Sequence, residues 1–156
     1  MVIDTKIVLW CAASVGVGVC VSTGYPIGIV AAVAMPPLVV CWPTRRDACR
    51  SAFCYYAGAL WPLVPAARNF FGPSASLLDG VVAWLTAALL LATPWPFAWT
   101  TRRVQFLWRV PLALFATVVP PLGLIGWASP LTAAGFVFPG TGWIGLLLLS
   151  VLCGNS

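Results

Sequence analysis

The chain has 156 residues, of which 62% are hydrophobic and only 7% are charged, whereas about 25% of the residues of a soluble domain are charged. Eight basic and three acidic residues give a formal net charge of +5, and there is no histidine. So few charges cannot cover a domain of this size with a polar surface. The composition therefore predicts an integral membrane protein, an all-α polytopic bundle of five to six membrane segments.

The missing residue types exclude several kinds of chemistry. Without histidine there is no Ser-His-Asp triad, no Cys-His dyad and no imidazole metal site. There is also no glutamate, and the three aspartates lie far apart in the sequence, at Asp4, Asp47 and Asp79. The basic residues form short clusters between apolar runs, which is typical of membrane topology. We therefore expect no cofactor, no metal and no direct binding of nucleic acid.

Two short apolar runs come first, at 7–22 and 27–42. At about 1.5 Å per residue, each run reaches about 24 Å, whereas a membrane span usually needs about 20 residues. They are predicted to be either two short spans or one re-entrant hairpin, and small residues such as Gly16 and Gly18 give the first run a face for helix packing. A signal peptide is the alternative for this run, although Asp4 weakens its positive start.

Four further apolar runs follow, at 51–67, 77–99, 110–127 and 142–153. They are separated by a charged loop at 43–50, a polar break at 68–76, a basic loop at 102–109 and an uncharged loop at 128–141. The proline pairs at 36–37 and 120–121 predict kinks or, alternatively, the broken helices of a transporter. The last run is too short for a span, so we expect this single domain to be the N-terminal part of a longer protein.

The basic residues predict the orientation in the membrane. If the 43–50 loop is cytoplasmic, the alternation of spans places only Arg68 on the outer side. Positive residues gather in cytoplasmic loops, so we expect a multi-pass protein of the bacterial inner membrane with a cytoplasmic N-terminus. The residues that set this topology are Lys6, Arg45, Arg46, Arg50, Arg102, Arg103 and Arg109.

Asp79 is the one acidic residue inside an apolar run. An ionisable residue within a membrane is a functional candidate, here as the polar gate of a channel together with Arg68. The simpler interpretation is that Asp79 pairs with Arg68 at the interface, or caps the helix start with Ser74 or Ser76. Three cysteines cluster near the first charged loop, but their spacing lacks a C-x2-C pair and does not predict a zinc site; they are Cys41, Cys49 and Cys54.

The segment PPLGLIGWASPLTAAGFVFPGTGWIGL, residues 120–146, resembles the end of the membrane region of TraB plasmid conjugal-transfer proteins. Tyr55-Tyr56 and the stretches at 63–65, 70–72 and 93–99 fit the same region. The resemblance implies membership of the carbon–nitrogen hydrolase superfamily, similar in layout to apolipoprotein N-acyltransferase. In that layout a helical membrane domain precedes an extracytoplasmic domain with a Glu-Lys-Cys site.

No catalytic residue can be carried over from this family. The chain has no glutamate, and its only lysine, Lys6, precedes the first apolar run. The resemblance therefore implies a non-enzymatic membrane anchor or scaffold in plasmid conjugation. Its expected partners are the lipid bilayer and other conjugation membrane proteins or a missing hydrolase domain. The alternatives are a small channel or transporter, or a non-functional gene fragment.

Overall fold

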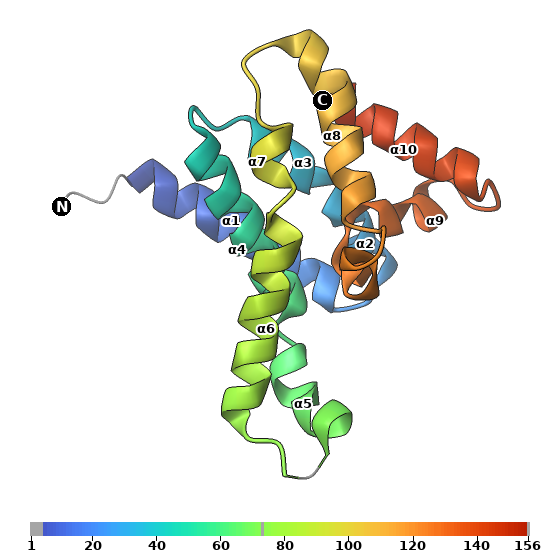
Figure 1. Cartoon of the computed structure of the whole chain (residues 1–156). Coiled ribbons are helices and arrows are strands. Elements are labelled where there is room, and N and C mark those ends of the chain that lie inside the picture. The colour runs from blue at the N-terminus through green and yellow to red at the C-terminus, as the bar shows by residue number, and fades with distance from the viewer. Residues whose placement is uncertain (1–4, 73, 156) are drawn as a thin grey trace.

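The computed structural model describes residues 5–72 and 74–155, and in these ranges all regular structure is helical (Figure 1). Each expected apolar run contains a helix, which confirms the all-α class. Figure 1 shows α1 and α4 side by side, α5 and α6 as a hairpin that extends from the body, and α8 and α10 on the other side. The main helices are α1 (Thr5–Ser22), α2 (Pro26–Ala31), α3 (Met35–Val40), α4 (Arg45–Leu60), α5 (Leu63–Phe71), α6 (Leu77–Ala92), α7 (Trp95–Ala98), α8 (Arg103–Ala116) and α10 (Trp143–Asn155).

In the second apolar run, prolines lie at the starts of the helices. The expected run 27–42 consists of α2, a 3-10 turn η1 (Ala32–Ala34) and α3, and the pair Pro36-Pro37 lies in the first turn of α3. Proline is tolerated there because the first N–H groups of a helix have no partner within it. The helical stretch Pro26–Val40 is interrupted by the 3-10 turn directly before this pair, and the kink expected there stays a prediction.

The charged segments are more helical than expected. The predicted loop at 43–50 is wrong from Arg45 onwards, because α4 begins there with Thr44 as its N-cap. The Thr44 hydroxyl accepts a hydrogen bond from the Asp47 N–H at 3.2 Å, and Asp47 accepts one from Arg50 at 2.8 Å. An acidic residue in the first turn also favours the helix dipole. Similarly, α5 extends to Phe71, into the expected polar break, and Arg109 lies within α8.

The contact between α1 and α4 depends on small residues. A Cβ atom on Gly18 would clash with the Tyr55 carbonyl oxygen, and one on Gly58 would clash with that of Val15. The two backbones therefore touch, as in small-residue contacts of membrane helices. Beside them, the buried hydroxyls of Ser14 and Ser51 form a hydrogen bond of 2.7 Å.

The uncharged segment after α8 folds back into the body. α8 ends at Ala116, and three 3-10 turns and a short helix follow, namely η2 (Leu122–Leu124), η3 (Gly126–Ala128), η4 (Pro130–Ala133) and α9 (Ala134–Val137). The expected loop at 128–141 is folded into the body in its first part, where Ala128, Ser129 and Leu131 are buried; the side of the membrane on which it lies stays a prediction. A loop can be buried where its backbone groups are paired, and here the Ser129 N–H donates to the Gly126 carbonyl at 2.8 Å.

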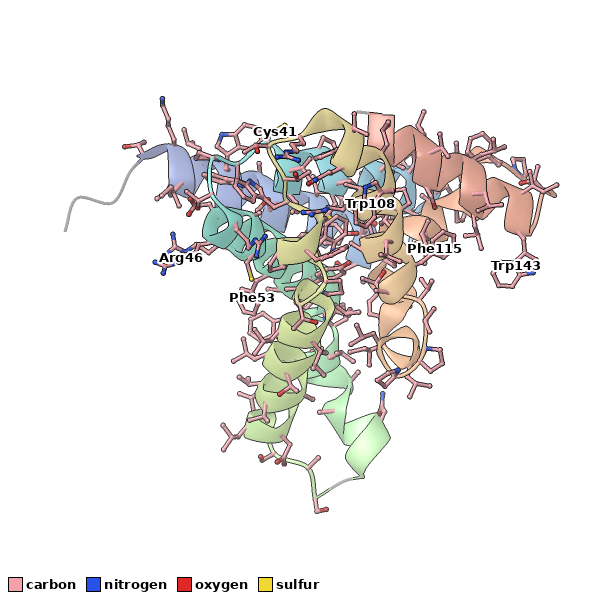
Figure 2. All side chains as sticks on the ribbon, turned by 45° about the horizontal axis from the view of Figure 1, so that its top comes forward. Cys41, Arg46, Phe53, Trp108, Phe115 and Trp143 are labelled. Atoms are coloured by element: carbon pink, nitrogen blue, oxygen red, sulfur yellow. The ribbon has the colours of Figure 1, made fainter. Side chains whose placement is uncertain are left out.

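The outside of the fold is apolar. Two helical stretches are long and apolar enough to cross a membrane, Thr5–Ser22 and Leu77–Ala98, yet in an apolar 18-residue window of each only 17% and 28% of the residues are buried. The apolar side chains of α10 are similarly exposed, and Figure 2 shows Trp143 at the start of this helix pointing away from the body. Apolar patches of this extent on a soluble monomer are rare and mark membrane or protein contacts.

A buried polar network as the candidate functional site

Two adjacent tyrosines of α4 point into the core. Tyr55 and Tyr56 are both 0% exposed, and their rings meet edge to face with centroids 5.0 Å apart. The Tyr55 hydroxyl donates a hydrogen bond of 2.9 Å to the carbonyl oxygen of Ala128. This bond attaches the buried segment after α8 to the centre of α4.

Tyr56 connects α4 with α7 and α8. The Trp95 indole N–H donates to the Tyr56 hydroxyl at 3.2 Å, and the Thr117 side chain also interacts with this hydroxyl. Thr117 in turn forms a hydrogen bond of 2.8 Å with the Ser129 hydroxyl. All of these side chains are fully buried, so the network joins four segments in the interior.

The chemistry of this network is structural. It consists of hydroxyl groups and one indole N–H, and it contains neither a carboxylate nor an amine that could act as a base. Inside a low-dielectric core, a satisfied polar network fixes one arrangement of its elements. We therefore infer that this network fixes the relative positions of α4, α7, α8 and the segment at 126–131.

An open groove runs along α6 on the outside of the fold. Its volume is about 540 Å³. Apart from Asp79 and Thr86 its walls are apolar and come from α6 and the segment after α8; the lining residues are Asp79, Val82, Ala83, Thr86, Ala87, Leu90 and Ile125. Such a wall suits an acyl chain or an apolar helix better than a polar substrate.

Asp79 caps the start of α6. Its carboxylate accepts hydrogen bonds from the Ser76 N–H and the Ser76 hydroxyl, both at 2.8 Å, and its own N–H donates to that hydroxyl at 3.3 Å. This reciprocal arrangement is a capping box. Capping was one of the two simpler interpretations, with Ser76 rather than Ser74 as the partner. The side chain of Arg68 lies outside the described residues, so the predicted Arg68–Asp79 pair stays a prediction.

The cysteines are dispersed. Cys41 is exposed, while Cys49 and Cys54 are half-buried on α4. The neighbour of the Cys54 thiol is Cys11 of α1. Within residues 5–72 and 74–155, no three His, Cys, Asp or Glu side chains are grouped closely enough to hold a metal ion.

Most of the topology-setting residues belong to helix starts and their flanks. Lys6 lies in the first turn of α1, and Arg45, Arg46 and Arg50 lie in the first half of α4. Arg102 precedes α8 and Arg103 begins it, although the side chain of Arg103 lies outside the described residues. The Arg109 guanidinium packs over the rings of Phe97 and Trp108.

Sequence reasoning does not identify the members of the network as a group. Thr117 lies in an apolar run and Ser129 in an expected loop, and neither stands out along the chain. The signal that is present is a hydroxyl residue in an apolar environment, because such a residue needs a partner when it is buried. Three of the stretches that carry the resemblance meet here, through Tyr55-Tyr56, Trp95 and Ser129.

Comparison with known proteins identifies two similar sequences. The chain is 36% identical over 135 residues, 86% of its length, to a protein of Sinorhizobium fredii named probable conjugal transfer protein TraB. It is 31% identical over 152 residues, 90% of its length, to a protein of Agrobacterium fabrum named conjugal transfer protein TraB. These similarities confirm the expected resemblance to TraB proteins.

The similarity concerns only part of each relative. The alignments cover 34% and 36% of the two proteins, so the chain spans about a third of the length of the relatives it matches. No protein-family model and no solved structure matches the chain. The wider relationship to carbon–nitrogen hydrolases and to apolipoprotein N-acyltransferase stays a prediction.

Proposed function

We propose that this chain is a helical inner-membrane domain of TraB type that acts in plasmid conjugation as a membrane anchor or scaffold. The observation that carries the proposal is the similarity over most of the chain to two proteins named conjugal transfer protein TraB. Its expected partners are the lipid bilayer and other membrane proteins of conjugation. In a longer relative, a hydrolase domain of the carbon–nitrogen superfamily would be a further partner.

The apolar exterior supports placement in a membrane. Large apolar side chains are exposed along α1, α6 and α10, among them Leu9, Leu89 and Leu147. Burying them in lipid is favourable by about 25 cal/mol for each Å² removed from water. The five or six membrane segments would then be α1, the broken segment 26–40, α4 with α5, α6 with α7, α8 and α10.

The placement of charge supports the orientation. The start of α1, the end of α3 and the start of α4 meet around one cavity, lined by Lys6, Trp42 and Asp47 among others. The Trp99 indole N–H donates to the Trp42 carbonyl at 2.8 Å, which brings the segment before Arg102 to the same place. We propose that this end is cytoplasmic, because positive residues favour that side. The turn between α5 and α6 would then be periplasmic.

We propose no catalytic activity for this chain. Its interior offers hydroxyl groups without a nearby base, and the chain has no glutamate to match a Glu-Lys-Cys site. A cysteine without a base stays largely protonated at neutral pH. Incubation of the purified chain with an acylating activity probe should leave every cysteine unlabelled. Turnover that disappears when one cysteine is replaced by alanine would contradict this.

The experiment that tests the scaffold proposal is genetic complementation. Deletion of the gene from its plasmid should lower the conjugation frequency, and expression of this chain together with the remaining transfer genes should restore it at least in part. The matched control is Gly18→Leu, which should abolish the restoration because α1 can no longer approach α4. Unchanged transfer in the deletion strain, or recovery of the chain in the soluble fraction, would refute the proposal.

A further inference from the structure

A second cavity lies at the end of the fold that holds most of the basic residues. Its volume is about 360 Å³. It is built by the start of α1, the end of α3 and the start of α4, so only the folded chain can form it. Figure 2 shows Cys41, one of its lining residues, at the top edge of the molecule. The lining residues are Lys6, Ile7, Trp10, Leu38, Cys41, Trp42, Pro43 and Asp47.

Trp42, one of the lining residues, carries an unused hydrogen-bond donor. Its indole Nε1 is buried and has no hydrogen-bond partner among the residues that the structure describes. A buried donor without an acceptor is unfavourable, because it has lost its hydrogen bonds to water. The residue is nevertheless held in place, since its carbonyl accepts from Trp99 at 2.8 Å and its ring lies 6.0 Å from that of Trp10. An acceptor supplied from outside the chain would remove this cost.

The charges around the cavity favour an anion. Lys6 contributes an ammonium group to the lining. Asp47 also lines the cavity, but its carboxylate already accepts hydrogen bonds from the Arg50 guanidinium and the Thr44 hydroxyl. The first turn of α4 contributes Asp47 to the lining, and the N-terminus of a helix is itself positive. The surroundings are therefore positive on balance.

We propose that this cavity binds the phosphate-bearing headgroup of an anionic phospholipid. Trp42 Nε1 donates to a phosphate oxygen, and Lys6 supplies the opposite charge. Trp10 and Ile7 contact the apolar part of the lipid, as amphipathic aromatic side chains do at membrane interfaces. The volume lies at the low end for ligand pockets, which fits a headgroup with its acyl chains outside. The inference rests on the membrane placement proposed above.

The test uses the full chain purified in a non-ionic detergent. Native mass spectrometry counts bound lipid during titration with dioleoylphosphatidylglycerol, dioleoylphosphatidylcholine or inorganic phosphate. We expect retention of phosphatidylglycerol at concentrations where phosphatidylcholine is lost. Trp42→Phe keeps the ring but removes the donor, and Lys6→Gln removes the charge, so each should weaken phosphatidylglycerol binding about tenfold.

Two controls make the result specific. Trp143→Phe changes an indole that is 79% exposed and outside the cavity, and Arg46→Gln removes a positive charge that does not line it. Both variants should bind phosphatidylglycerol within about twofold of the unchanged chain. Lys6→Gln alters an exposed side chain, so it keeps the test informative if Trp42→Phe fails to fold.

Several results would overturn the site. These are equal binding by Trp42→Phe, Lys6→Gln and the unchanged chain, no preference for phosphatidylglycerol over phosphatidylcholine, or Trp42-dependent binding of inorganic phosphate without the lipid. Fractionation of the cells gives a separate answer on membrane placement. A chain found in the soluble fraction refutes the proposed function, whereas a membrane-embedded chain whose variants all bind alike refutes only this site.

Discussion

At the scale of single residues, the Tyr55 hydroxyl is the group on which the buried segment after α8 depends. We expect Tyr55→Phe to lower the free energy of unfolding by about 1–2 kcal/mol, because the Ala128 carbonyl loses its donor in an apolar interior. Unfolding in mixed detergent micelles would measure the difference. The matched control is Tyr25→Phe, since Tyr25 is 73% exposed and its change should cost less than about 0.5 kcal/mol. Equal stability of the two variants would contradict the role of the network.

The capping box at α6 leads to a second prediction at this scale. Ser76→Ala should destabilise the start of α6 by about 1 kcal/mol, the usual cost of losing an N-cap side chain. Asp79→Asn should destabilise the helix start less than Ser76→Ala does, because asparagine keeps an oxygen that can accept from Ser76. Ser74→Ala is the control, since Ser74 is exposed in the same turn and caps nothing in the described structure. Hydrogen exchange of the first turn of α6 would report the loss. Complete unfolding of Asp79→Asn would instead show that Asp79 is held by a required buried partner.

At the scale of elements, the pairing of α1 with α4 depends on Gly18. We expect Gly18→Ala to destabilise the fold by about 1–3 kcal/mol, because the new methyl group would meet the Tyr55 carbonyl and push the helices apart. Gly16→Ala is the matched control, since no atom lies within 4 Å of a Cβ atom there. It should be neutral or stabilise the helix by up to about 1 kcal/mol.

Cross-linking can report how closely α1 approaches α4 in the Gly18→Ala and Gly16→Ala variants. The Cys11 and Cys54 thiols are neighbours across this interface, so a short bis-maleimide linker should join them in the unchanged chain and in Gly16→Ala. The yield should fall clearly in Gly18→Ala. A yield that falls equally in both glycine variants would contradict the role of the close approach.

At the scale of the whole molecule, the proposed topology predicts the side of each connection. Alkaline phosphatase fused after Ser74 or after Gly140 should be active in the periplasm, whereas a fusion after Thr101 should be inactive. A fluorescent protein that folds only in the cytoplasm should give the reverse pattern at the same three positions. Phosphatase activity after Thr101 combined with none after Ser74 would invert the proposed orientation.

Some features of this protein were determined by the sequence alone. Apolar runs between short charged clusters predicted the all-α class and a helix within each run, because hydrophobicity over a run of residues is a local property; the helix boundaries at Arg45 and Phe71 were not predicted. The resemblance carried by residues 120–146 needs only the order of the residues, and it pointed to TraB proteins. The role of Asp79 in capping could also be anticipated, because a cap is formed within one turn of its helix.

Other features were decided only by the tertiary structure. The sequence placed Ser129 in an uncharged loop and did not relate it to Thr117, yet the two hydroxyls meet in the core. Gly16 and Gly18 look alike in the sequence, but only Gly18 faces a neighbouring backbone. The cavity around Trp42 needs three elements that are separate along the chain. These contacts depend on how the helices pack, and packing is fixed by the whole set of side chains rather than by local pattern.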